Sequence, residues 1–240
     1  MAKKKEKYKN VWKAIRKILL RFILFFFSFT ILSVVVLKWM PIRYTPLMFQ
    51  RYMENISNNS YYNTREWKPI EKISYNMVLA VLASEDNNFM GHWGFDMDAI
   101  KRAMEQNRRR GTKYGASTIS QQTAKNVYLL PSRTWIRKGF EAYFTVLIEL
   151  VWSKERIMEV YLNIVEVGDG LYGVEAASQK YFNKPASKLT ANEAAQIASI
   201  LPNPRLYNLT SPSQYLINRQ QKIRRLMRLV NPPDINAAKN

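Results

Sequence analysis

Two adjacent carboxylates, Glu85 and Asp86, lie where an apolar stretch gives way to a loop rich in aromatic residues and glycine, ASEDNNFMGHWGFD (83–96). A carboxylate at the end of an apolar helix can be partly removed from water, which raises its pKa and suits it to proton transfer. A solvated helix end explains the same pattern, and the residues alone leave both interpretations open. For His92 we expect a hydrogen-bonded structural role, because the chain has no second His and no Cys to share a metal ion.

A polar stretch, YGASTISQQTAKN (114–126), stands out in a chain that is otherwise apolar or basic. Its hydroxyls and its two adjacent amides can line a sugar site, because these groups match sugar hydroxyls as hydrogen-bond donors and acceptors. The simpler interpretation is a turn followed by a helix that Ser117 or Thr118 caps.

Four cations within fourteen residues accompany this stretch: Lys125, Arg133, Arg137 and Lys138. Such a cluster beside a polar segment can neutralise a pyrophosphate. Glu141 lies one helical turn after Arg137, and a pair at this spacing is usually a surface ion pair that contributes about 0.3–0.5 kcal/mol. The cluster therefore predicts either an anion site or an ordinary solvated helix face.

The composition excludes several classes of protein. The 240 residues include 37 Lys and Arg, 18 Asp and Glu, one His and no Cys, with a formal net charge of +19. Without Cys the chain has no disulfide scaffold, thiol nucleophile or thiolate zinc site. It also lacks Walker, GxGxxG, GxSxG and HExxH motifs, which disfavours nucleotide hydrolysis, dinucleotide chemistry, serine esterases and zinc proteases. The charge predicts an anionic partner: nucleic acid, a membrane surface or a phosphorylated substrate.

The first forty residues predict where the chain is placed. Residues 1–21 carry nine cations and one acid, and the sixteen residues Phe22–Leu37 carry no charge. With its apolar flanks this run reaches the roughly twenty residues that a membrane span requires, whereas a cleaved signal peptide would need a shorter run and a small-residue cleavage site. We therefore predict a cytoplasmic basic tail at 1–17, an uncleaved transmembrane anchor at 18–40, and the remainder outside the cytoplasm. This placement argues against nucleic acid as the partner.

Helical patterns dominate the rest of the chain. Residues 41–64 show no sustained period and are predicted to be a membrane-proximal linker, and residues 65–240 are predicted to form one mostly α domain. Helices are expected at 74–85, 96–111, 135–151, 153–161, 190–202 and 211–231, with Ser74, Asp96, Ser153 and Thr190 as caps and long loops near 86–95, 111–117 and 164–173.

Five segments of this domain form an ordered set: EDNNFMGHWGFD (85–96), GASTISQQTAKN (115–126), RKGFE (137–141), KERIMEVYLN (154–163) and GVEAASQKYFNK (173–184). Together they resemble the five sequence blocks of peptidoglycan glycosyltransferases, glycosyltransferase family 51, over roughly residues 65–210. The resemblance implies a lysozyme-like, α-helical glycosyltransferase domain with a small membrane-facing jaw near residues 97–116. It also implies lipid II as substrate, with inverting transfer of the growing lipid-linked glycan from undecaprenyl pyrophosphate to the 4-hydroxyl of lipid II.

The resemblance assigns roles to individual residues. Glu85 matches the general base and Glu141 the second essential acid, near which a divalent cation such as Mg²⁺ could bind; no organic cofactor is implied. The substrate-binding positions are Asp86, Phe89, His92, Thr118, Gln121, Gln122, Lys125, Arg133 and Arg137, with the last three as cations for the pyrophosphate. The second block reads Gly-Ala where Gly-Gly is commoner, which is a small departure.

The resemblance also implies partners and a location. Lipid II, the growing lipid-linked glycan, membrane lipids and other cell-wall synthesis proteins are the expected partners, and nucleic acid is not. The expected location is the bacterial cytoplasmic (inner) membrane, with one span. Since the chain ends about 30 residues after ILPNPRLYN (200–208), we expect no penicillin-binding transpeptidase domain.

Two other functions fit part of the pattern. A lysozyme-like lytic enzyme that cleaves peptidoglycan glycan would also use a lone catalytic Glu in an α-helical domain. It leaves the clustered Lys125, Arg133 and Arg137 unexplained, because a glycan chain carries no pyrophosphate. A non-enzymatic membrane protein that binds an anionic polymer through its basic surface is the third hypothesis.

Overall fold

The computed structural model describes residues 2–55, 66–111, 115–132 and 134–230. The chain divides into two compact units, Met1–Met40 and Pro41–Asn240. The first unit consists of α1 (Ala2–Leu37), in which Trp12–Leu37 is long and apolar enough to cross a membrane. At about 1.5 Å per residue this stretch measures about 39 Å, and the hydrocarbon core of a bilayer is about 30 Å thick. By length and composition, α1 is therefore suited to the predicted membrane anchor.

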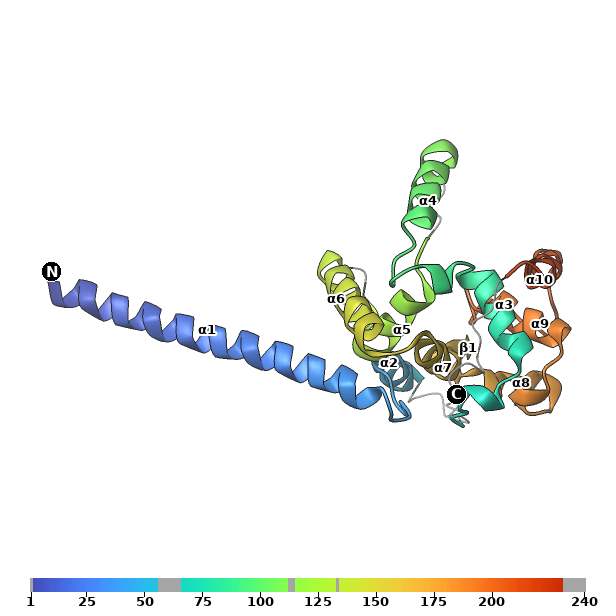
Figure 1. Ribbon diagram of the computed structural model, residues 1–240, viewed down its shortest axis with the longest axis horizontal. Coiled ribbons are helices and arrows are strands. Elements are labelled where there is room, and N and C mark those ends of the chain that lie inside the picture. The colour runs from blue at the N-terminus through green and yellow to red at the C-terminus, as the bar shows by residue number, and fades with distance from the viewer. Residues whose placement is uncertain (1, 56–65, 112–114, 133, 231–240) are drawn as a thin grey trace. The chain divides into compact units, whose positions relative to one another are not determined.

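The second unit is built almost entirely of helices (Figure 1), which confirms the predicted mostly α fold. Its elements are α2 (Pro46–Asn55), α3 (Tyr75–Glu85), α4 (Met97–Arg110), α5 (Ile119–Tyr128), α6 (Trp135–Val151), α7 (Lys154–Ile164), β1 (Glu166–Gly168), β2 (Leu171–Tyr172), α8 (Val174–Phe182), α9 (Ala191–Ile200) and α10 (Gln214–Leu226), with 3₁₀ turns at Ile70–Lys72, Phe89–Gly91 and Ala186–Lys188. The two strands form an antiparallel hairpin where the sequence predicted a loop. Strands of two and three residues are too short to show an alternating pattern.

Several helix starts and stops follow their predicted chemistry. The Asp96 carboxylate accepts a hydrogen bond from the Ala99 backbone N–H at 2.8 Å and so caps α4. Gly111 ends α4 in the left-handed conformation, with a φ of 62°. Thr190 and Glu193 form the predicted capping box of α9. The sequence therefore correctly places both ends of α4, the helix of the predicted jaw.

One predicted cap and the bounds of one predicted helix are wrong. The Ser74 hydroxyl does not cap α3; it donates to the Leu189 carbonyl at 2.7 Å and ties the start of α3 to the segment before α9. The last helix begins at Gln214, capped by Ser213, and ends at Leu226. The segment SPS offers two serines that can cap, and only the observed backbone shows that the second one does.

Part of the predicted linker at 41–64 is a helix, α2. Pro46 occupies its first position, where the missing N–H is no loss, and the Thr45 hydroxyl accepts from the Met48 N–H at 3.3 Å. Met48 is buried, and α2 contacts α5. Threonine followed by proline was the signal for this helix. Residues 56–64 of the predicted linker lie outside the described residues.

The core positions the ends of two helices that carry sequence blocks. Helix α3 contacts α9 and α10, and α5 contacts α6 and α7. Three alanines of α9, Ala194, Ala195 and Ala198, are fully buried, and such small side chains allow neighbouring helices to approach closely. The last residue of α3 and the first turns of α5 are thereby held on the same packed scaffold.

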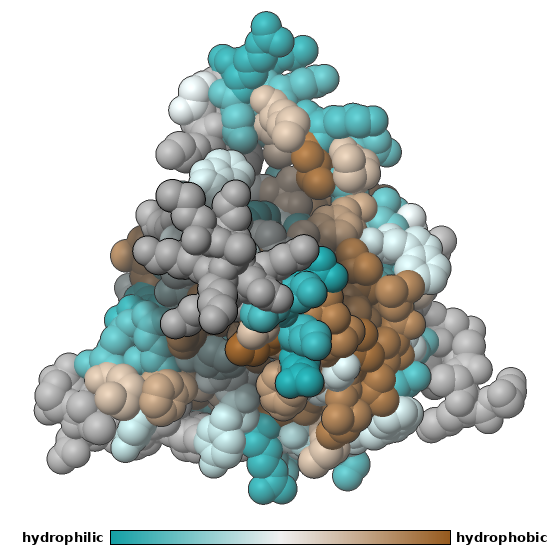
Figure 2. Space-filling model, turned by 90° about the vertical axis from the view of Figure 1, so that its left-hand side faces the viewer, coloured by the Kyte–Doolittle hydropathy of each residue, from teal (hydrophilic) through white to brown (hydrophobic). Residues whose placement is uncertain are grey.

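Helix α4 projects from the rest of its unit (Figure 1) and makes up most of the predicted jaw at 97–116. Met97 and Met104 are 60% and 66% exposed, and Arg108 and Arg109 are exposed near its C-terminal end. Figure 2 shows hydrophilic surface over this helix, at the top of the view. Residues 112–114 of the predicted jaw lie outside the described residues.

Candidate functional site

Glu85 is the last residue of α3, and its carboxylate is largely buried, with 12% of the side chain exposed. One oxygen, Oε2, accepts a hydrogen bond from Gln122 Nε2 at 3.0 Å. The other, Oε1, lies 3.6 Å from the Arg219 guanidinium of α10. Burial raises the pKa of the Glu85 carboxyl above its ordinary value, and Gln122 and Arg219 partly oppose this rise. A carboxylate of this kind is a stronger base than one in water.

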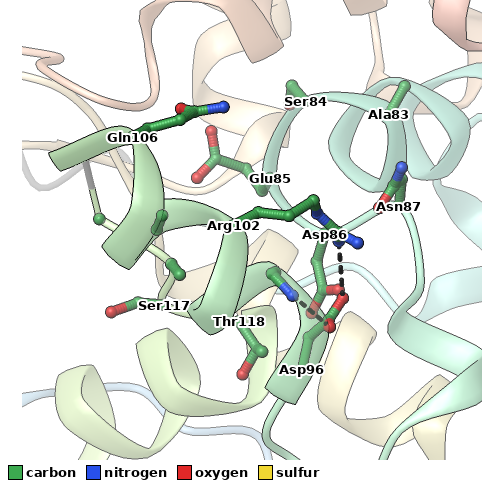
Figure 3. A pocket seen from close by; sticks show the side chains of 14 residues that line it. Ala83, Ser84, Glu85, Asp86, Asn87, Asp96, Arg102, Gln106, Ser117 and Thr118 are labelled. Atoms are coloured by element: carbon green, nitrogen blue, oxygen red, sulfur yellow. Dashed lines mark hydrogen bonds and ion pairs between the residues drawn. The ribbon is translucent and has the colours of Figure 1, made fainter. Parts of the chain in front are cut away.

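A cavity of about 310 Å³ opens beside Glu85, between the end of α3, the helix α4 and residues 115–118. The Glu85 carboxylate and the side chains of Arg102 and Gln106 border it (Figure 3). Arg102 lies 3.9 Å from the Asp96 carboxylate on the same wall. The cavity is lined by polar side chains and can therefore accept a hydroxyl-rich ligand next to the buried base.

Asp86 borders the same cavity but already has protein partners. Its carboxylate accepts from His92 Nε2 at 3.0 and 3.1 Å. It also accepts at 3.0 Å from the backbone N–H of Ile119, the first residue of α5. Phe89 is buried and meets the His92 ring edge to face. These three predicted substrate-binding side chains therefore tie the loop after α3 to the start of α5.

The two adjacent amides of the second block have different surroundings. Gln121 forms a capping box with Thr118: its side chain accepts from the Thr118 N–H at 3.1 Å. The Thr118 hydroxyl donates to the Gly94 carbonyl at 2.6 Å, and Gly94 adopts a φ of 79° that favours glycine. Only Gln122 reaches Glu85. Of the two glutamines, one shapes the helix start and the other contacts the buried carboxylate.

Lys125 lies on the same face of α5 as Gln122, three residues further along. It lines a second cavity, of about 420 Å³, together with Arg137. Its ammonium forms no hydrogen bond or ion pair with any described residue, and burial lowers the pKa of Lys125. One face of α5 therefore connects the base to a cationic cavity. Arg133, predicted to add to this cluster, lies outside the described residues.

Glu141 is buried in α6, with 4% of its side chain exposed. Its carboxylate lies 3.4 Å from the Arg137 guanidinium and also accepts from Lys138. The spacing had favoured a surface ion pair, but the carboxylate is instead removed from water and held by two cations. In this position it can hold Arg137 at the second cavity.

Comparison with known proteins identifies the family. The profile of the Transglycosylase family matches residues 50–228, about three quarters of the chain. The chain belongs to this family. This result confirms the relationship and the enzyme class predicted from the five sequence blocks.

Transglycosylases from several bacteria are similar to the chain along most of its length. A biosynthetic peptidoglycan transglycosylase of Bacteroides thetaiotaomicron is 52% identical over 209 residues, which are 87% of this chain and 84% of that protein. Proteins of the same name from Bdellovibrio bacteriovorus and Pasteurella multocida are 48% and 44% identical; the matches cover 88% and 92% of this chain and 85% and 91% of those proteins.

The donor set around Glu141 does not fit a metal ion held by this transglycosylase-family chain. Arg137 and Lys138 already occupy the Glu141 carboxylate. Within the described ranges, no three His, Asp or Glu side chains gather into a group that could hold a metal. The mechanism below therefore uses the cations of the chain.

Sequence reasoning missed Arg219, which contacts the proposed base of this transglycosylase-family site. Its Nε also donates to the Ser199 carbonyl at 3.1 Å, so the guanidinium is fixed between α9 and Glu85. Arg219 lies in NRQQKIRRL, a helix with several cations and no local feature that marks one of them. Only the packing of α10 against α3 reveals it.

Proposed function

We propose that this chain is a peptidoglycan transglycosylase that polymerises lipid II, with Glu85 as the general base. The observation that carries the proposal is a buried, basic carboxylate that lines a polar cavity and is bound by Gln122 of α5, the helix whose Lys125 lines a cationic cavity. A polar cavity suits an acceptor hydroxyl, and a cationic cavity suits a phosphorylated donor. The name shared by its bacterial relatives supports the same substrate class.

The reaction is an inverting displacement at the anomeric carbon of the donor. The acceptor 4-hydroxyl of lipid II lies in the polar cavity, and Glu85 takes its proton as the oxygen attacks. The new bond joins the acceptor oxygen to the anomeric carbon, and the bond from that carbon to the phosphate oxygen breaks. The electron pair leaves with undecaprenyl pyrophosphate, and the α-linked donor becomes a β-1,4 glycan.

The leaving pyrophosphate needs charge neutralisation, which the second cavity supplies. Lys125 and Arg137 line this cavity, and Glu141 holds Arg137 in place. Fixed cations at developing negative charge stabilise the transition state without a proton transfer to the leaving group. Arg133 is the third cation that the resemblance implies for this step.

The proposed location follows from α1 and from the substrate. A lipid-linked donor is available only at a membrane, and α1 provides a helix that can cross one. The excess of Lys and Arg before the apolar run favours a cytoplasmic N-terminus, with the second unit on the outer side of the bacterial cytoplasmic membrane. Other cell-wall synthesis proteins are the proposed protein partners.

Purified full-length protein in lipid vesicles, incubated with labelled lipid II, tests this function. We expect glycan polymers that lysozyme degrades, with release of undecaprenyl pyrophosphate. A protein that makes no polymer but releases muropeptides from purified cell wall is a lytic enzyme, and the proposal is then wrong. Anionic-polymer binding without either product would favour the non-enzymatic hypothesis.

The pH dependence of the reaction is expected to report on Glu85. The base acts only when ionised, and burial raises its pKa above the ordinary 4.5 of glutamate, so kcat/KM should fall on the acidic side at a correspondingly raised pH. Gln122→Met removes a hydrogen bond that lowers this pKa. The acidic limb should therefore move to higher pH, and at the wild-type midpoint the variant should have less than half of its own maximal rate.

Gln221→Met, an exposed change on α10, is the matched control and should leave the pH profile of kcat/KM unchanged. An acidic limb that stays in place or moves to lower pH in Gln122→Met would show that the limb belongs to another group.

A further inference from the structure

The second cavity contains a cation that lies outside the five sequence blocks. Arg51 of α2 lines it together with Lys125 of α5, Arg137 of α6 and Glu166 of β1. Three cations from three helices meet one carboxylate, which leaves a net charge of about +2 in the cavity wall. A pyrophosphate diester carries one negative charge on each phosphate, so the charge of the wall matches this ligand.

Arg51 is held in place by two acids. Its Nη1 donates to the Glu54 carboxylate at 2.7 Å, and its Nε lies 3.5 Å from Glu166 Oε1. With 20% of the side chain exposed, the guanidinium is mostly removed from water. A guanidinium has five N–H donors in a rigid fork, so these contacts leave donors for a further acceptor.

Unsatisfied polar atoms in the wall point to a missing ligand. Arg137 Nε is buried without a hydrogen-bond acceptor among the described residues, whereas Arg51 Nε, which also lacks a hydrogen bond, faces the equally unsatisfied Glu166 Oε1. The ammonium of Lys125 also has no such acceptor there. Buried donors are usually paired, because an unpaired one loses its water without replacement. Lys125 and Arg137, together with the N–H donors that Arg51 has left, fit an anion with several oxygens.

We propose that Arg51 binds the pyrophosphate of the lipid-linked donor, as a further cation contributed by α2. The inference rests on the proposed function, since that function supplies the pyrophosphate. It extends the binding site to the helix that precedes the first sequence block. Helix α2 is fixed for this purpose by its contact with α5, the helix that carries Lys125.

Calorimetric titration of undecaprenyl pyrophosphate into the full-length protein in detergent micelles tests the proposal. A charge-assisted hydrogen bond contributes about 1.5–3 kcal/mol, so Arg51→Gln is expected to weaken binding about 10–100-fold. Arg51→Lys keeps the charge without the fork and should lose less affinity. Arg224→Gln, an exposed change on α10 with the same loss of charge, should bind within about twofold of the wild type.

Glu54→Gln separates ligand binding from a structural role. This change breaks the same Arg51–Glu54 ion pair but leaves the guanidinium free for the ligand. We expect Glu54→Gln to bind undecaprenyl pyrophosphate at least as tightly as the wild type. If Glu54→Gln instead weakens binding as much as Arg51→Gln does, Arg51 serves only to hold the fold, and the proposal is overturned.

Vesicles containing phosphatidylglycerol distinguish the donor from a lipid headgroup. An Arg51→Gln variant that binds these vesicles less well, yet binds undecaprenyl pyrophosphate like the wild type, would assign Arg51 to the headgroup and overturn the proposal. Lipid II polymerisation by the wild type tests the proposed function separately from the role of Arg51. If the wild type polymerises lipid II and Arg51→Gln leaves pyrophosphate binding unchanged, only the role of Arg51 is wrong.

Discussion

Replacement of Glu85 by Gln is expected to reduce lipid II polymerisation by about 10²–10⁴-fold, the range that a positioned general base contributes. Gln keeps the size of the side chain and cannot take a proton from the acceptor hydroxyl. Burial and the Gln122 hydrogen bond set the basicity of the Glu85 carboxylate, and the amide of Gln at this position is not a base. Initial rates of glycan synthesis from labelled lipid II, at saturating substrate, measure the effect.

The same substitution is expected to leave the protein at least as stable as the wild type at pH 7. Because burial raises the pKa of Glu85 in the folded state, its stabilising contribution is present below the unfolded pKa and is lost as pH rises through the folded pKa. Near neutrality the ionised carboxylate destabilises the fold, and Gln removes this cost. Thermal unfolding at pH 7 measures it.

Glu71→Gln, an exposed change in the 3₁₀ turn before α3, is the matched control for both measurements and should have wild-type activity and stability. Full polymerisation by Glu85→Gln would reject the assigned base. A large fall in the melting temperature of Glu85→Gln would show that the carboxylate stabilises the fold instead.

The periodic helices were predictable because their signals are local. Asp96 and Gly111 bound α4 as expected, since a cap and a left-handed stop act within one turn of the helix. The hairpin of β1 and β2 and the role of Ser74 were not predictable in this way. Each depends on a partner brought near by the fold, and the Ser74 hydroxyl reaches a carbonyl 115 residues away.

The sequence predicted which residues gather in the candidate site, but not which contact each of them makes. Gln121 and Gln122 are adjacent in sequence and alike in chemistry, yet about 100° separates them around a helix of 3.6 residues per turn. One therefore caps α5, and the other contacts Glu85. The blocks locate both amides, and only the start of the helix decides which of them reaches the buried carboxylate.

The two arginines that sequence reasoning missed lie outside the five sequence blocks. Arg219 contacts Glu85 and Arg51 lines the second cavity, and their helices flank the blocks on either side. Neither belongs to a short motif, so single-sequence reasoning has no way to select them among 37 cations. The substrate-binding role of Asp86 stays a prediction: Asp86 lines the first cavity, and its oxygens accept from His92 and Ile119.

Replacement of Lys125 by Met is expected to reduce kcat/KM for lipid II by about 10²–10³-fold, comparable to the loss of one preorganised charge-stabilising group in an active site. Met has nearly the length of the Lys stem and lacks the ammonium. Lys125 lines the cationic cavity and has no acceptor among the described residues, so its charge is available to the leaving pyrophosphate. Steady-state polymerisation rates at several lipid II concentrations measure the effect.

Stability distinguishes this loss from damage to the fold. Burial lowers the pKa of Lys125, so the folded state disfavours the charged form, and at pH 7 the ammonium destabilises the protein. Lys125→Met should therefore unfold at the same temperature as the wild type or a higher one, while it loses activity. Lys222→Met, an exposed change on α10, should alter neither property. A Lys125→Met protein that polymerises lipid II at the wild-type rate would remove Lys125 from the mechanism, because the proposed step depends on that buried charge.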